Sequence, residues 1–366
     1  ALLILLPLLT LLIPKKTFSE NENRYLATFP LPTLKTIADK SFMNNVETYL
    51  SDHFVMREQW IQFKNQLDIL SNKKEINNVY LTKKRLIEHQ TVKANDTQWQ
   101  TNIAAMNSFV SKYQLPSYLM VVPTAESIYF DQLPKYAPYI NQKELIDQIY
   151  ARIPAKSKLS PIDVYTPLLA AKNQYIFYKT DHHWTSLGAY LGYFASSKAL
   201  NFSQIDVDSF NIEHASHDFK GTLYSKTLYD KCGADVIDLY HLTTSDPRTA
   251  VTVKSGSKVS EYSSIFFRDY LEKKDKYATF LGQNEPYVSV KTSINNGKKL
   301  LIFKDSYAHS MVQFYMHHYE EITLVDLRYL ASLEQYVNIY DYDQILFVYN
   351  FESMMTDANI GKLALF

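Results

Sequence analysis

The segment KLLIFKDSYAHS, residues 299–310, decides the fold class of this 366-residue chain. Its beginning, KLLIF at 299–303, is an apolar run without polar alternation, which predicts a strand buried on both faces. A helical pattern follows over 307–319, and the same order then repeats. The next expected elements are a strand at 322–325, a helix at 330–337 and a strand at 344–349. Two consecutive right-handed βαβ units, and therefore a parallel sheet, fit this order.

Earlier parts of the chain alternate in the same way. The expected elements are a strand at 118–122, a helix at 142–153, a strand at 175–178 and a helix at 186–200. Such alternation predicts an α/β fold with a mostly parallel central sheet. The stretch 202–287 is less regular, and we expect a β-rich insertion or a rim of the functional site around it.

The first residues predict the remnant of a membrane anchor. Thirteen uncharged residues, ALLILLPLLTLLI, precede Pro14 and two lysines. This run is shorter than the roughly 20 residues that cross a bilayer. We therefore expect residues 1–14 to be the last part of a signal anchor or signal peptide, with a buried core helix as the alternative. Helical spacing over 34–70 predicts two helices, so residues 15–75 are expected to form a helical collar before a main domain at 76–366.

The composition excludes several classes of protein. Lys and Arg number 38 and so do Asp and Glu, which leaves no overall field to attract nucleic acid, and no nucleic-acid partner is expected. With 46% hydrophobic residues, the chain is not mainly disordered. Only 8 residues are glycine, and no Gly-rich phosphate motif is present, so nucleotide chemistry is disfavoured. The single cysteine, Cys232, excludes an intramolecular disulfide.

The first segment with catalytic potential is KTDHHW, residues 179–184, between an expected strand and an expected helix. In extended backbone Asp181 and His183 project to the same side, while His182 points away. A carboxylate beside an imidazole can hold its Nδ1–H and leave Nε2 free as a base. A structural or metal-binding histidine pair is the alternative. A metal would need a third ligand, and the only candidates are weak: His214 with His217, and His317 with His318.

The second segment is IFKDSYA, residues 302–308, where a buried strand passes into a helix. Ser306 would lie at the carboxyl edge of a parallel sheet, where open α/β folds bind ligands. Its own backbone N–H, at the start of the helix, could face a developing oxyanion. These features suit a nucleophile. The alternative is that Asp305 or Ser306 serves only as a helix N-cap.

Together the two segments resemble a known family. YKTDHHWTSLGAY (178–190) and FKDSYAHS (303–310) resemble the DHHW branch of the SGNH-hydrolase superfamily, relatives of the alginate O-acetylation proteins of the J and X type. Further similar segments are ENRYLATFP (22–30), YLSDHFVMR (49–57), VVPTAESIYFDQLP (121–134), FLGQN (280–284) and LVDLRYL (324–330). The resemblance implies an SGNH-hydrolase-like three-layer sandwich, preceded by the N-terminal helical segment and membrane anchor.

The resemblance also implies a catalytic triad in the chain order Asp, His, Ser. Ser306 is then the nucleophile, His183 the general base and Asp181 its orienting partner. The glycine that commonly precedes Asp-Ser in the superfamily is Lys304 here, which puts the local turn in doubt. For the oxyanion we expect the Ser306 N–H, with Asn284 or Gly282 as further donors. Arg328 is expected either to bind substrate or to pair with a neighbouring carboxylate.

The function that the resemblance implies is polysaccharide O-acetylation outside the cytoplasmic membrane, through an acetyl-serine intermediate. No bound cofactor or metal is expected, because an acetyl donor supplies the transferred group. The implied partners are a polysaccharide acceptor, a membrane-bound O-acyltransferase, and the membrane itself through the N-terminal anchor. The alternatives are a secreted carbohydrate acetyl esterase and a non-catalytic glycan-binding subunit of an acetylation complex.

Overall fold

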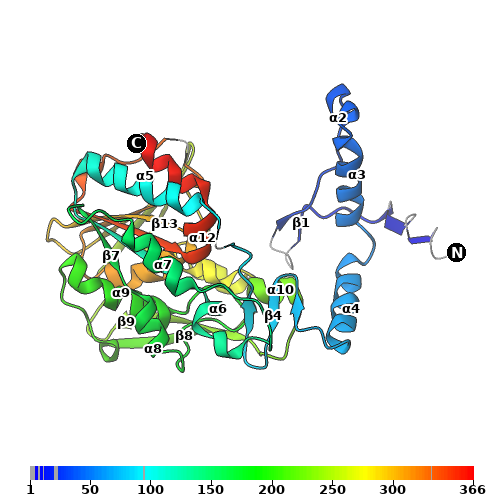
Figure 1. Ribbon diagram of the computed structural model, residues 1–366, viewed down its shortest axis with the longest axis horizontal. Helices are drawn as coiled ribbons and strands as arrows, with labels where there is room; N and C mark the ends of the chain where they lie inside the picture. Colours follow the sequence, from blue (N-terminus) through cyan, green and yellow to red (C-terminus); the bar gives the residue numbers. More distant parts are fainter. Residues whose placement is uncertain (1–4, 7–8, 11, 20–23, 94, 331) are drawn as a thin grey trace.

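The computed structural model describes residues 5–6, 9–10, 12–19, 24–93, 95–330 and 332–366. Most of the chain forms an α/β body, and the N-terminal helices stand away from it on one side (Figure 1). The predicted anchor remnant at 1–14 lies partly outside the described residues. Among those that are described, no helix combines the length and the apolar character needed to cross a bilayer.

The body is built on an eight-stranded sheet in the order β11-β10-β12-β14-β13-β15-β6-β7. The bounds are β6 (Ser117–Val122), β7 (Leu159–Ile162), β10 (Thr249–Ser255), β11 (Lys258–Tyr262), β12 (Tyr287–Thr292), β13 (Lys299–Lys304), β14 (Glu321–Val325) and β15 (Gln344–Asn350). The five strands from β14 to β7 run parallel to their neighbours, whereas β12, β10 and β11 pair antiparallel. The sheet is therefore mixed: five of its eight strands are parallel to one another, and the antiparallel pairing of β12, β10 and β11 at one side is the part that the sequence did not indicate. A hairpin as short as the one between β10 and β11 can join only antiparallel strands.

Successive residues of the central strands face two separate cores. On β13, Leu300 and Ile302 point into one core, while Leu301 and Phe303 point into the other. This explains why KLLIF has no polar alternation: both faces are covered by helices. The first face carries α6 (Ala125–Ile128), α8 (Tyr165–Ala170), α9 (Ser186–Leu200), η5 (Ser306–Met311) and α11 (Val312–Tyr315). The second carries α5 (Gln98–Tyr113), α7 (Gln142–Ala151), α12 (Phe351–Thr356) and η7 (Ala358–Leu365).

Outside these layers the chain forms smaller units. β8 (Phe210–Phe219) and β9 (Asp235–Leu242) make a two-stranded antiparallel sheet, with α10 (Thr222–Thr227) between them in sequence. A second small sheet comprises β3 (Glu75–Ile76), β4 (Val79–Leu81) and β5 (Leu86–Glu88). The remaining short elements are η1 (Phe130–Gln132), η2 (Val207–Ser209), η3 (Arg268–Glu272), η4 (Lys276–Thr279) and η6 (Ile339–Asp341).

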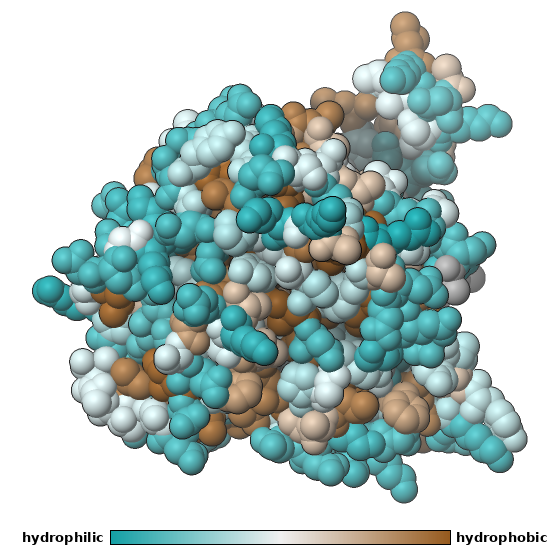
Figure 2. All heavy atoms as spheres, turned by 60° about the vertical axis from the view of Figure 1, so that its left-hand side comes forward, coloured by the Kyte–Doolittle hydropathy of each residue, from teal (hydrophilic) through white to brown (hydrophobic). Residues whose placement is uncertain are grey.

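Residues 34–70 contain three helices where the sequence predicted two. They are α2 (Leu34–Ala38), α3 (Ser41–Asp52) and α4 (Arg57–Leu70), and β1 (Phe18–Ser19) pairs with β2 (Arg24–Tyr25). A hydrogen bond from Asn65 Nδ2 to the carbonyl of Thr227, at 3.0 Å, links α4 to the body. Apolar side chains such as Leu34 remain open to solvent. Figure 2 shows hydrophobic atoms on the projection at upper right, at the height of α2 in Figure 1.

Most expected elements are confirmed within one or two residues, but three are not. Residues 175–178 make only one isolated bridge, between Phe177 and Trp184. The described part of 330–337 contains no helix, and the helix expected at 307–319 is a 3₁₀ turn followed by the short α11. In each case most of the described apolar residues are buried, as Leu330 and Leu333 are. Apolar periodicity reports burial, and irregular backbone can provide it as well as a helix can.

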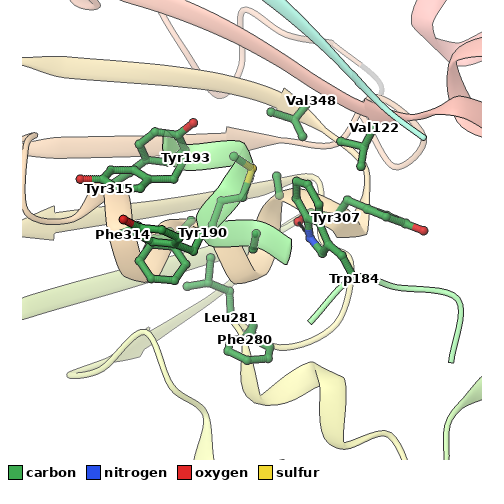
Figure 3. Packing of buried hydrophobic residues seen from close by; sticks show 14 of the residues in the cluster. Val122, Trp184, Tyr190, Tyr193, Phe280, Leu281, Tyr307, Phe314, Tyr315 and Val348 are labelled. Atoms are coloured by element: carbon green, nitrogen blue, oxygen red, sulfur yellow. Dashed lines mark hydrogen bonds between the residues drawn. The ribbon is translucent and has the colours of Figure 1, made fainter. Parts of the chain in front are cut away.

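Trp184, the last residue of DHHW, is a structural residue of this core. Its ring is fully buried, and Nε1 donates to the carbonyl of Tyr307 at 3.0 Å and to Ser310 Oγ at 3.1 Å. Figure 3 shows it beside Tyr307 within the aromatic cluster. A Cβ on Gly192 would lie 2.8 Å from the Trp184 ring, so α9 approaches the indole closely only because this residue is glycine.

Replacing the Trp184 side chain is expected to destabilise the folded protein. Trp184→Ala should lower the free energy of unfolding by about 3–5 kcal/mol, because it leaves a large cavity and two buried acceptors without their donor. Urea unfolding monitored by circular dichroism measures the change. Trp60→Ala on α4, where the ring is 42% exposed, is the control and should shift stability by about 0.5 kcal/mol. Equal effects of the two substitutions would contradict this assignment.

Candidate active site

The functional residues gather at the carboxyl edge of the parallel strands. Ser306 lies two residues after the end of β13, as the first residue of η5. Asp305 is the N-cap of this turn and accepts from the Tyr307 N–H at 2.9 Å, so the hydroxyl of Ser306 is not needed as a cap. Because Ser306 is the first residue of the turn, its backbone N–H takes no part in the hydrogen bonds within the turn.

The structure brings together the three residues that the sequence singled out. Ser306 Oγ lies 2.7 Å from His183 Nε2, and His183 Nδ1 lies 2.6 Å from Asp181 Oδ1. The serine and the histidine are 123 positions apart in the chain. His183 and Asp181 are buried, whereas Ser306 is half-buried. The geometry is that of a base held by a carboxylate on one nitrogen and bonded to a hydroxyl on the other.

Asp181 is held by more than the imidazole. Its Oδ2 accepts from Thr222 N at 2.8 Å and from Thr222 Oγ at 3.0 Å, both at the start of α10. A Cβ on Gly221 would lie 2.3 Å from Asp181 Oδ2, so the contact requires glycine at 221. Sequence reasoning missed Gly221 and Thr222. The scarcity of glycine in the chain was the only available signal.

Burial and hydrogen bonding set the charge states. Burial raises the pKa of Asp181, but the neighbouring imidazoles and the Thr222 N–H outweigh it, and the net pKa lies well below the usual range. Burial lowers the pKa of His183 to about 4; His182 adds to this and Asp181 opposes it. His183 is therefore neutral at pH 7, as a general base must be.

Tyr277, on η4, completes the surroundings of the imidazole and was also missed from the sequence. Its ring stacks on that of His183, with centroids 3.8 Å apart and planes 8° from parallel. Its hydroxyl donates to the carbonyl of Ser306 at 3.0 Å. Tyr277 thus fixes both the base and the backbone of the serine.

Lys304 anchors a buried polar network beside Ser306. Its ammonium lies 2.9 Å from Asn284 Oδ1, 2.7 Å from His309 Nε2 and 3.2 Å from Asp326 Oδ2. Three acceptors match the three N–H donors of an ammonium. Burial lowers the pKa of Lys304, and Asp326 opposes the shift. Because Asn284 Oδ1 accepts from Lys304, the NH₂ group of the same amide points away from Lys304.

The other predicted binding residues have different outcomes. The N–H of Gly282 donates to the carbonyl of Ala278 at 2.9 Å, so this group is not available as an oxyanion donor. Arg328 pairs with Asp326 through two bonds, Nε to Oδ1 at 2.9 Å and NH2 to Oδ2 at 2.6 Å. The carboxylate pairing expected for Arg328 is therefore present, while 31% of its side chain stays open to solvent.

His182 faces a different environment from His183. Its Nδ1 lies 2.7 Å from Thr222 Oγ, and its ring borders a small hollow lined also by Gln90, Thr124, Tyr307, Asn350 and Glu352. Asp181, His182 and His183 offer three potential metal-ligand atoms within 4.8 Å of one another. A metal held there by Asp181 Oδ1 and His183 Nδ1 would replace the hydrogen bond that orients the base. Metal binding and the triad are therefore mutually exclusive uses of these side chains.

Comparison with known protein families identifies the class to which this chain, with its mixed α/β fold and triad-like site, belongs. Residues 97–325 match the family model described as DHHW protein, and the chain belongs to the DHHW family. A solved DHHW family protein from Eubacterium siraeum is 25% identical, with a TM-score of 0.64, over 78% of this chain and 96% of that chain. Bacillus cereus PatB1 is 20% identical, with a TM-score of 0.64, over 77% and 98%.

A more distant likeness is to the O-acetyltransferase domain of Pseudomonas putida AlgJ, which is 14% identical with a TM-score of 0.48 over 79% of this chain and 99% of that domain. No curated protein sequence matches significantly.

The site predicts an unusual pH dependence of serine reactivity. Phenylmethylsulfonyl fluoride should label Ser306, because His183 takes the proton of Oγ as the serine displaces fluoride from sulfur. Since the pKa of His183 is lowered to about 4, the base stays neutral on acidification, and the rate should hold from pH 8 to about 5.5. Intact-mass measurement follows the adduct.

Two variants test this assignment. His183→Ala should slow labelling by about 10²–10⁴-fold, and His182→Ala far less. A rate that falls tenfold per pH unit already below pH 6.5, or a larger effect at His182, would contradict it.

Proposed function

We propose that this protein is an extracytoplasmic polysaccharide O-acetyltransferase that works through an acetyl-serine intermediate. The observation that carries the proposal is the continuous chain of short hydrogen bonds from Ser306 through His183 to Asp181 at the ligand-binding edge of the sheet. Membership of the DHHW family is consistent with it.

The first half-reaction loads the serine. His183 Nε2 takes the proton of Ser306 Oγ as this oxygen bonds to the carbonyl carbon of an acetyl ester. The leaving alcohol then departs with the proton that His183 held, and an acetyl ester remains on Ser306. In the second half-reaction His183 deprotonates a sugar hydroxyl, which attacks the acetyl carbon, and the proton returns to Ser306 as the ester breaks. Both steps exchange one ester for another, so the demanding task is to exclude water.

Two groups are proposed to stabilise the oxyanion. The N–H of Ser306 lies at the start of η5, where the backbone donors are not yet used by the turn. The second is the amide NH₂ of Asn284, whose direction is set because Lys304 holds its oxygen. Arg328, which remains partly exposed, would contact the substrate.

The acetyl donor and the location belong to the same proposal. Activated acetyl groups are made inside the cell, so an enzyme outside the membrane needs a membrane-bound O-acyltransferase to pass them on. The apolar N-terminal residues would hold the two proteins at the same membrane surface. No metal or bound cofactor takes part in the proposed steps.

The assay is transfer of acetyl from 4-nitrophenyl acetate to chitohexaose, read by mass spectrometry of the oligosaccharide. Ser306→Ala should abolish transfer, and Asp181→Asn should lower the rate by about 10⁴-fold, because the imidazole loses its orienting carboxylate. His182→Ala is the matched control on the neighbouring imidazole and should cost much less.

Each alternative function gives a distinct result in this assay. Release of acetate without acetylated sugar would identify an esterase. Wild-type acetylation of glycan in cells by a folded Ser306→Ala protein would identify a non-catalytic subunit.

A further inference from the structure

A cluster of aromatic rings lies at the end of β11, next to the loops that surround the triad. It consists of Tyr262, Phe267 and Tyr270, and we call it the aromatic platform. The rings of Tyr262 and Phe267 stack with centroids 4.0 Å apart and planes 25° from parallel. Tyr262 is 42% exposed, and the other two rings are partly buried. Three rings at a surface are available to a ligand without rearrangement of the core.

Contacts with neighbouring residues hold the rings of the platform in position. A Cβ on Gly282 would lie 3.0 Å from two ring carbons of Phe267, so the glycine backbone supports that ring directly. The Phe267 N–H donates to the carbonyl of Thr279 at 2.8 Å. Lys273 Nζ lies 4.1 Å from the centroid of the Tyr270 ring. A pre-positioned surface of this kind loses little conformational entropy when a ligand binds.

Two hollows flank the platform, and both use its three rings. Polar side chains line the first, among them Glu261, Ser263, Arg268, Asp269 and Lys273. The second is lined also by Ser255, Lys258, Ser260, Gly282, Gln283 and Glu285. Over both hollows three cationic side chains (Lys258, Arg268, Lys273) balance three anionic ones (Glu261, Asp269, Glu285). The surface is therefore aromatic and rich in hydrogen-bonding groups, but carries no net charge.

The loop of residues 282–284 connects the aromatic platform to the candidate active site. Gly282, Gln283 and Asn284 form one loop: Gly282 supports Phe267, while Asn284 is bonded to Lys304 beside Ser306. The two ends of this three-residue step are at most about 7 Å apart along the backbone. Thr279, which accepts from Phe267, lies two residues after Tyr277, whose ring stacks on His183. One loop therefore supports both the platform and the polar network beside Ser306.

This combination fits a sugar ring. A pyranose has an apolar face of C–H bonds, which the electron-rich face of an aromatic ring attracts, and a rim of hydroxyl groups that need polar partners. We propose that the aromatic platform is an acceptor subsite that binds a pyranose unit of a neutral glycan, several sugars away from the unit that is acetylated at Ser306. The proposal rests on the proposed function for its role, but the binding itself does not require catalysis.

Calorimetric titration of the folded Ser306→Ala protein with chitohexaose and cellohexaose tests the site without turnover. Tyr262→Ala and Tyr270→Ala, each added to Ser306→Ala, should weaken binding by about tenfold, because each removes one ring from the sugar contact. Gly282→Ala should weaken it too, because its Cβ would displace Phe267. The control is Tyr340→Ala, which removes a ring that is 68% exposed on η6, before the amino end of β15 and thus away from the carboxyl edge that carries Ser306. It should leave binding unchanged.

The outcomes separate this proposal from the proposed function. Selective loss of binding in the platform variants supports the subsite, even if the wild-type protein transfers no acetyl group. Unchanged binding in the platform variants, an equal loss in Tyr340→Ala, or no binding of either hexasaccharide overturns the subsite, even if acetyl transfer is intact. Tighter binding of an acidic polyuronate of the same length would also overturn it, because the platform carries no excess positive charge. Unfolding midpoints of the variants show whether each protein is folded.

Discussion

The buried carboxylate of Asp235 is the constraint on which the site depends. It has no exposed surface, and it accepts hydrogen bonds from Lys179 N, from the N–H and hydroxyl of Thr180, and from the hydroxyl of Tyr175. These donors fix the backbone immediately before Asp181, in a segment that has one isolated bridge, between Phe177 and Trp184, in place of a regular strand. Leaving them buried without an acceptor would cost on the order of 1–3 kcal/mol for each group. Asp235 thereby replaces the ladder that a strand would have provided, and the direction of Asp181 and His183 follows from it.

What could be predicted from the sequence was set by local geometry. The i, i+2 relation selected His183 over His182, and the end of an apolar strand selected Ser306, because both rules act within a few residues. Tyr277, Thr222 and Asp235 reach the site across long stretches of chain. Their residue types are common, and nothing in their spacing marks them. A β-rich segment was expected around 202–287, but the pairing of β10 to β12 with the main sheet could not be predicted, since the neighbour of a strand in the sheet is not encoded near it.

The site is divided between two segments of the chain, and Tyr277 connects them. Asp181 and His183 share one segment, in which the His183 ring stacks on Tyr277, whereas the backbone of Ser306 is fixed by β13 and by the hydroxyl of the same tyrosine. Tyr277 therefore links the base and the nucleophile more directly than the sheet does. Because η4 continues into the loop that supports Phe267, the aromatic platform and the candidate active site share one support.

The buried network around Lys304 constrains which residues relatives of this chain can have at positions 304 and 326. A buried ammonium with three acceptors is tolerated only while Asp326 balances its charge, and Asp326 in turn is tolerated only with Lys304 and Arg328 around it. Neither position can drift by itself. In an alignment of relatives we therefore expect covariation: a chain with an uncharged residue at position 304 should also lack the acid at 326.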